Sequence, residues 1–186
     1  PVCGGPTKIR MENETKTLYC TNPRCQAKHV KAFALFASRD AMNIEGLSEA
    51  PLEKFIMNGF IKDFTDIFHL ERYEVEIKNI EGFGEKSYQN LQASIRNARV
   101  TTLPRLVYSL GIPNIGISNA RMICQALGND PERVMNAAEE ELDEIQGVGE
   151  VIAKTFAEYF AAEEHRDIFR RLLDEVEIPE AEAPAG

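Results

Sequence analysis

The sequence predicts a mainly α-helical protein, in which a small cysteine-bearing unit with short β pieces precedes four repeats of a helix, a short hairpin and a second helix. Three observations carry this prediction. Three of the four cysteines lie within the first 25 residues, four glycine-centred turns recur along the rest of the chain, and apolar residues follow each turn at helical spacing. The 186 residues suffice for one or two domains with a real core.

The first expected unit covers residues 1–30 and contains two β-like stretches, PTKIRM and KTLYC. Its start, PVCGGPTKIR, lacks the apolar core of a signal peptide. Cysteines without a secretory signal favour a reducing compartment, with metal binding ahead of disulfides.

The cysteine spacing predicts a structural zinc site of the four-cysteine type. Cys20 and Cys25 form one hairpin-like pair, and Cys3 is one member of a second pair. A cysteine immediately before Pro1 would complete a C-P-x-C pair, so we expect an excised fragment whose metal ligands are Cys3, Cys20 and Cys25. His29 is a less favoured ligand.

The second expected unit, residues 31–177, repeats one pattern four times. Each copy has a marker residue, one apolar residue and a second small residue, and the markers are 36, 32 and 33 residues apart. We number these turn 1 to turn 4: Gly46-Leu47-Ser48, Gly82-Phe83-Gly84, Asn114-Ile115-Gly116 and Gly147-Val148-Gly149. Residues 178–186 are rich in Pro, Ala and Glu and are expected to form a linker or tail.

An amphipathic helix is predicted after every turn. The positions four, seven and eleven residues beyond the second small residue define one helical face. Eleven of these twelve residues are apolar or aromatic: Leu52, Phe55, Gly59; Tyr88, Leu91, Ile95; Ala120, Ile123, Leu127; Ala153, Phe156, Phe160. The segments AFALFASRDAMNI and LPRLVYSLGI are expected to contain preceding helices. Cys124 is expected to be a buried small apolar residue.

The two departures from glycine fit one backbone geometry. The marker is expected in the left-handed region, which Gly and Asn tolerate, so Asn114 is compatible with it. The second small residue starts a helix, and Ser48 is a favoured N-cap whose side chain can bond the first free amides. The central apolar residue is expected to pack between the two helices.

Charge is distributed unevenly. Residues 1–39 carry seven Lys/Arg and two Asp/Glu, a net +5, whereas residues 40–186 carry 14 and 28, a net −14. The total of −9 argues against broad electrostatic adhesion to nucleic acid. This net charge is still compatible with local binding of phosphates, because the first amides of a helix have no intrahelical partner and form an anion site.

The glycine turns resemble the helix-hairpin-helix family of DNA-binding motifs, so the expected fold is a zinc knuckle followed by a tandem array of four such motifs. Lys86, Arg121 and Lys154 lie on the helices after turns 2, 3 and 4, whereas Arg96 and Arg99 are expected on a solvated face. His69 and His165 are assigned no role. The expected DNA-binding residues are Gly46, Ser48, Gly82, Gly84, Lys86, Asn114, Gly116, Arg121, Gly147, Gly149 and Lys154.

The order of these motifs resembles the C-terminal half of the bacterial NAD-dependent DNA ligases. The resemblance rests on PVCGGP, YCTNPRCQAK, ASRDAMNIEGLSE, IEGFGEKSYQNL, YSLGIPNIG and IQGVGE, and spans essentially the whole chain. It implies a module that binds nicked duplex DNA across the minor groove without sequence preference, in replication and repair, with the zinc finger as a structural joint.

The same resemblance implies that adenylation chemistry lies elsewhere in the parent protein. NAD and Mg would serve the parent enzyme and would not bind this fragment, which would be inactive alone and would lack catalytic residues. Its partners would be nicked DNA and the remaining ligase domains, in a monomeric, cytoplasmic bacterial protein without a membrane span. Turns 1 and 3 each lack one glycine, so turns 2 and 4 are the stronger phosphate candidates.

Three alternatives differ in class. A helical-repeat interaction module would share the repeat length of 32–36 residues, but the T-P-L-H signature of ankyrin repeats is missing from the sequence. Another helix-hairpin-helix repair protein would not explain the zinc knuckle directly before the array. An enzyme in its own right would need a catalytic constellation, and none is visible in the sequence.

Overall fold

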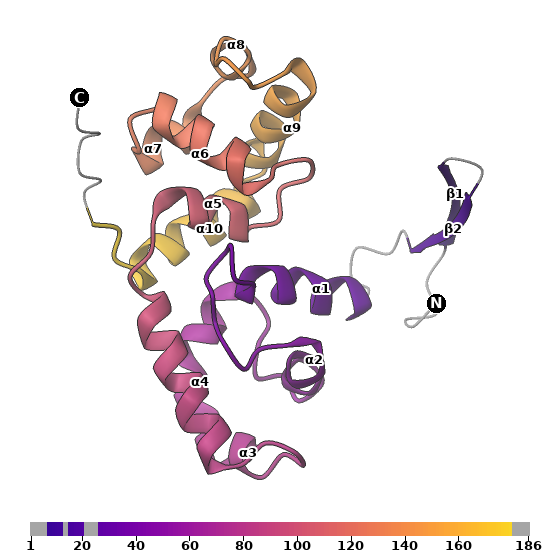
Figure 1. The fold of residues 1–186 in the computed structure, drawn as a ribbon, viewed down its shortest axis with the longest axis vertical. Coiled ribbons are helices and arrows are strands. Elements are labelled where there is room, and N and C mark those ends of the chain that lie inside the picture. Colours follow the sequence, from indigo (N-terminus) through magenta and orange to yellow (C-terminus); the bar gives the residue numbers. More distant parts are fainter. Residues whose placement is uncertain (1–6, 13–14, 21–25, 180–186) are drawn as a thin grey trace.

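The computed structural model describes residues 7–12, 15–20 and 26–179, with side chains from His29 onward (Figure 1). Strands β1 (Thr7–Glu12) and β2 (Thr15–Cys20) form an antiparallel pair, at the two places where the sequence predicts β pieces. Cys3 and Cys25 lie outside the described residues, and only the backbone of Cys20 is described. The zinc site therefore stays a prediction.

Helices make up most of the remaining chain. They are α1 (Gln26–Ala37), α2 (Glu49–Met57), the 3-10 segment η1 (Phe64–Tyr73), α3 (Glu74–Lys78), α4 (Glu85–Ala98), α5 (Leu103–Ser109), α6 (Ile117–Ala126), α7 (Pro131–Asn136), α8 (Glu139–Asp143), α9 (Glu150–Ala161) and α10 (Glu163–Glu175). Helix α1 begins before residue 31, where the sequence places the start of the helical unit. Among the described helices, none combines the length and apolar character needed to cross a membrane.

Each turn connects two helices that pack against each other. The pairs are α1 with α2, α3 with α4, α5 with α6, and α8 with α9. A pair of packed helices thus flanks each of the predicted turns. Segments η1, α7 and α10 lie between or after these pairs, and the sequence pattern did not predict them individually.

The predicted apolar face forms the core. Of its twelve residues, all but Gly59 are buried, and so are the central residues Leu47, Phe83, Ile115 and Val148. Gly59 differs because it lies beyond the end of α2 in the left-handed region, with a φ of +73°. The amide of Phe60 then bonds the carbonyl of Phe55 at 2.9 Å and completes the helix end.

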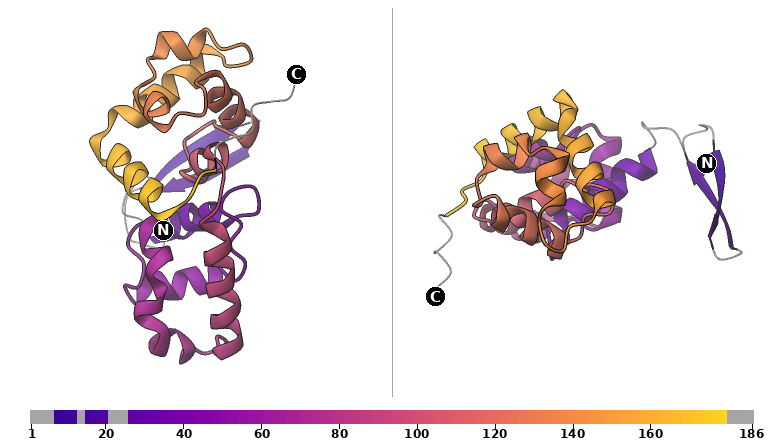
Figure 2. Two further views of the ribbon diagram at one scale, coloured as in Figure 1. Left: turned by 90° about the vertical axis from the view of Figure 1, so that its left-hand side faces the viewer. Right: turned by 90° about the horizontal axis from the view of Figure 1, so that it is seen from above.

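The helices form two halves joined by residues 99–102. The first half contains α1 to α4 with turns 1 and 2, and the second contains α5 to α9 with turns 3 and 4 (Figure 1). Helix α10 returns from the second half and packs against both η1 and α9. The buried apolar residues of both halves form one continuous cluster from Phe33 to Leu172, and Figure 2 shows the halves stacked along the long axis.

Candidate nucleic-acid interface

All four marker residues have the left-handed backbone that the sequence predicts. Their φ values are +93° at Gly46, +82° at Gly82, +64° at Asn114 and +91° at Gly147. The turn then reverses the chain within three residues. In turns 2, 3 and 4 the amide of the central residue bonds the carbonyl of an isoleucine three residues earlier: Phe83 to Ile80, Ile115 to Ile112 and Val148 to Ile145.

The second small residue is the N-cap of the following helix in every copy. Ser48, Gly84, Gly116 and Gly149 have extended backbones, and their carbonyls accept the first intrahelical bonds of α2, α4, α6 and α9 at 2.9–3.1 Å. The expectation for the Ser48 side chain is wrong, because its hydroxyl makes no capping hydrogen bond. The first amides of α2 therefore also lack a side-chain cap.

Three other helix starts in the same chain are capped by side chains, whereas the starts of α3, α8 and α10 are not. Thr102 accepts from the amide of Arg105 at the start of α5, Asp130 does so for Glu132 of α7, and Asp63 for Thr65 of η1. At α2, α4, α6 and α9 no side chain takes this role. The first amides of these four helices therefore remain available to an external acceptor, at the positive end of the helix dipole.

The fold itself does not require glycine at the second position of the turns. Gly84, Gly116 and Gly149 have negative φ values that any residue adopts, and a Cβ built on them meets nothing within 4 Å. Gly147 is different, because its positive φ strains any residue with a side chain, and a built Cβ would lie 2.7 Å from the Met122 sulfur, which would have to move. The open space beside the N-caps can accommodate the close approach of another molecule.

Some charged side chains around the turns favour the approach of an anion, and others oppose it. Lys86, Arg121 and Lys154 are exposed and form no ion pair within the described part of the chain. Glu85 and Glu150 occupy the first helical positions after turns 2 and 4. These carboxylates stabilise the free helices through the dipole and repel an approaching anion.

The marker and N-cap residues of the turns lie on the surface of the molecule. All eight marker and N-cap residues are exposed: Gly46, Ser48, Gly82, Gly84, Asn114, Gly116, Gly147 and Gly149. In Figure 1 the turns before α4, α6 and α9 all project toward the right-hand side of the molecule.

The prediction that Arg99 lies on a solvated face is wrong, and His69, to which the sequence assigns no role, contacts the same partner as Arg99. The Arg99 guanidinium donates to the Phe68 carbonyl at 2.8 Å and to the Glu175 carboxylate at 3.1 Å. His69 Nε2 lies 2.6 Å from the same carboxylate. These groups are 76 and 106 residues from Glu175 in the sequence, so no local spacing could reveal the cluster.

Burial and hydrogen bonding set the ionisation of the groups that hold α10. Partial burial acts to raise the pKa of Glu175, but hydrogen bonds from His69 and Arg99 outweigh it and hold that pKa below its ordinary value. The pKa of Asp63 is lowered in the same way, since bonds from Thr65 and Arg171 overcome its burial. Burial raises the pKa of the Cys124 thiol to about 12, which confirms Cys124 as an inert core residue.

Residues 105–169 match the family model described as a helix-hairpin-helix motif. The matched range contains turns 3 and 4. The glycine pattern of the sequence predicts a helix-hairpin-helix motif in this range, and the match confirms the motif there.

The chain is also similar to proteins named DNA ligase. It is 49% identical over 186 residues to the one from Lachnoclostridium phytofermentans, covering 100% of this chain and 28% of the relative. The protein from Ruminiclostridium cellulolyticum is 50% identical over 182 residues, covering 98% of this chain and 28% of the relative. The protein from Pseudothermotoga lettingae is 37% identical over 172 residues, covering 92% of this chain and 25% of the relative.

The chain thus spans little more than a quarter of the length of the curated relatives that it matches most fully. It contains a helix-hairpin-helix motif and is similar, along its entire length, to one part of proteins named DNA ligase.

Proposed function

We propose that this chain is the DNA-binding module of an NAD-dependent DNA ligase and holds nicked duplex DNA without sequence preference. Its whole length aligns with proteins named DNA ligase, and turns 3 and 4 lie within the helix-hairpin-helix match. Turns 1 and 2 have the same backbone geometry as turns 3 and 4. We therefore count four such motifs in the array.

The observation that carries the proposal is that the four helices after the turns begin without a side-chain cap, three of them at a glycine beside open space. The starts of η1, α5 and α7 are closed by Asp or Thr side chains. The starts of α3, α8 and α10 also lack a side-chain cap, but their N-caps are Tyr73, Ala138 and Ala162 and not glycine. DNA phosphates are acceptors for the free first amides of a helix. A grip made of backbone groups is compatible with a net charge of −9.

The four turns differ in how well they suit a phosphate. Turns 2 and 4 keep glycine at both positions, so the backbone can approach a DNA strand closely. The Ser48 side chain in turn 1 and the Asn114 side chain in turn 3 occupy part of this space. Turns 2 and 4 are the primary contacts, supported by Lys86 and Lys154.

Zinc and NAD belong to the proposal in different ways. The thiols of Cys3, Cys20 and Cys25 are the donors that zinc prefers, and a zinc ion held there would be structural. NAD and Mg would act in another part of the whole ligase, whose remaining domains are the protein partners.

We expect Cys20→Ser to lower the zinc content of the purified chain, as measured by atomic emission, while Cys124→Ser leaves it unchanged.

Titration of the chain with a labelled nicked duplex, an intact duplex and a single strand of unrelated sequences tests the function. We expect saturable binding to the duplexes at low salt, with a shallow dependence on salt because few Lys and Arg contact phosphates. Absence of duplex binding at low salt, or binding to one sequence alone, would contradict the proposal.

A further inference from the structure

The two halves of the helical body each present two turns, and their spacing depends on the segment that joins them. Residues 99–102 run from the end of α4 to the start of α5 as the chain link between turn 2 and turn 3. A duplex held by both halves requires a defined orientation across this link. The groups that hold the link are therefore relevant to DNA binding, although they lie away from the turns.

The C-terminal segment holds the link on one side through the backbone. Glu177 donates its amide to the carbonyl of Arg99 and accepts the amide of Thr101 at 3.1 Å. These bonds form an isolated parallel bridge between Val100 and Glu177. Residues more than 70 positions apart are thus joined next to the junction of the two halves.

Arg99 extends this attachment to the first half. Its guanidinium donates to the Glu175 carbonyl at 3.0 Å and to the Glu175 carboxylate at 3.1 Å, while its other terminal nitrogen donates to the Phe68 carbonyl of η1 at 2.8 Å. His69 of η1 contacts the same carboxylate at 2.6 Å. The side chain of Glu175 is only 20% exposed, so these contacts are shielded from solvent more than an ordinary surface pair.

A second ion pair lies one turn earlier on α10. Arg171 donates to Asp63 at 2.9 Å, and Asp63 is also the cap of η1. Helix α10 packs against α9 of the second half as well as η1 of the first. It consequently spans the junction, and its ion pairs with Asp63 and Arg99 lie on the side of the first half.

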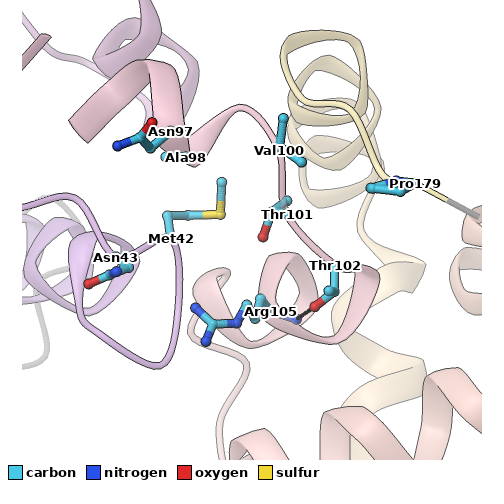
Figure 3. A pocket seen from close by; sticks show the side chains of 9 residues that line it. All are labelled: Met42, Asn43, Asn97, Ala98, Val100, Thr101, Thr102, Arg105 and Pro179. Carbon is cyan, nitrogen blue, oxygen red and sulfur yellow. Dashed lines mark hydrogen bonds between the residues drawn. The ribbon is translucent and has the colours of Figure 1, made fainter. Parts of the chain in front are cut away.

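Close packing does not hold the link on its other side. A cavity of about 270 Å³ lies there, lined by Met42 and Asn43, the end of α4, the link itself, Arg105 and Pro179 (Figure 3). Across this cavity Arg105 donates to the carbonyls of Arg39 and Ala41, at 3.3 Å each. The orientation of the halves therefore depends on specific polar contacts at the junction as well as on the shared core.

We infer that Arg99, Glu175 and Arg171 are positioning residues for DNA binding: they hold turns 1 and 2 at a fixed spacing from turns 3 and 4, so that one duplex engages both halves. This inference rests on the proposed function. When both halves are held in register, the second contact forms at a high effective concentration, and looser halves lose this advantage without losing any single contact.

The test compares two duplexes on the full chain. One has about 20 base pairs and the other about 10, roughly two turns and one turn of the helix. Glu175→Gln should weaken binding to the long duplex by about tenfold and to the short duplex by less than about twofold, since only the long one engages both halves. Arg99→Lys should recover part of the loss relative to Arg99→Gln.

Glu141→Gln is the matched control, because it removes an exposed ion pair, Arg133–Glu141, that lies within the second half. It should leave the ratio of the two affinities unchanged. An unchanged ratio in Glu175→Gln, or an equal loss on both duplexes, would overturn the inference while leaving duplex binding by the parent chain intact. Failure of the parent chain to bind either duplex would instead overturn the proposed function.

A distance measurement without DNA tests the positioning role independently of the proposed DNA-binding function. Spin labels on unnatural residues at the exposed positions Gln89 of α4 and Glu158 of α9 report the separation of the halves. The distribution of distances should broaden in Glu175→Gln and stay narrow in Glu141→Gln, with thermal unfolding confirming that both variants are folded. Equal distributions in the two variants would contradict the positioning role whatever the DNA titrations give.

Discussion

Glycines in the turns serve two separate purposes that their shared sequence pattern conceals. Gly82 and Gly147 have positive φ values, so the backbone itself demands them. Gly84 and Gly149 have ordinary negative φ values and open surroundings, so nothing inside the chain demands them. The proposed reason for the second kind is contact with a DNA strand.

Substitutions in turn 2 separate these purposes. Gly84→Val should weaken duplex binding by about three- to tenfold through lost backbone approach, at a stability cost of about 1 kcal/mol or less. Gly82→Val should destabilise the chain by about 1–2 kcal/mol through left-handed strain. Denaturant unfolding and duplex titration of both variants measure this, and equal losses of stability and affinity in Gly84→Val would favour a purely structural turn.

Charge at the helix starts gives a second prediction at this scale. Lys86→Gln should lower the slope of log affinity against log salt by about one, if the ammonium contacts a phosphate. Glu150→Gln should raise duplex affinity about twofold, because it removes a carboxylate beside the turn 4 amides. Arg133→Gln, distant from the turns in sequence, is the control, and equal slopes in all three variants would exclude Lys86 from the interface.

At the scale of elements, the helices divide by how their first turn is satisfied. The starts of η1, α5 and α7 have side-chain caps, whereas those after the four turns and those of α3, α8 and α10 have none. Among these uncapped starts, glycine is the N-cap only at α4, α6 and α9. Helix periodicity and turn chemistry in the sequence predict the four helix pairs, because both are local. They do not predict η1, or the contact of α10 with it, because the partner groups are about 100 residues apart.

The attachment of α10 should depend on pH. Glu175 and Asp63 have lowered pKa values in the folded chain, so their contribution to stability is complete above the ordinary values of 4.5 and 3.8 and is lost as pH falls through the lower folded values. Thermal unfolding between about pH 3 and 6 should show a steeper acid decline for the parent chain than for a Glu175→Gln, Asp63→Asn variant. Parallel curves would contradict this account of how α10 is attached.

At the scale of the whole molecule, the acidic helical body and the basic N-terminal unit are competing candidates for DNA contact. The sequence predicts the buried faces and the left-handed markers, and the structure confirms these. It misassigns Arg99 to a solvated face and Ser48 to a side-chain cap, because both depend on neighbours that spacing does not reveal. Residues 1–39, the N-terminal unit together with α1, have a net charge of +5, so simple electrostatics would place the DNA there.

Amide chemical shifts during titration of the chain with a nicked duplex test the central claim most directly. The account predicts saturable shifts for the amides of Glu85, Lys86 and Ser87 after turn 2 and for the first amides of α9 after turn 4, with small changes at the capped starts of α5 and α7. Shifts confined to the basic residues of the N-terminal unit, with the turn amides unmoved at saturation, would contradict it.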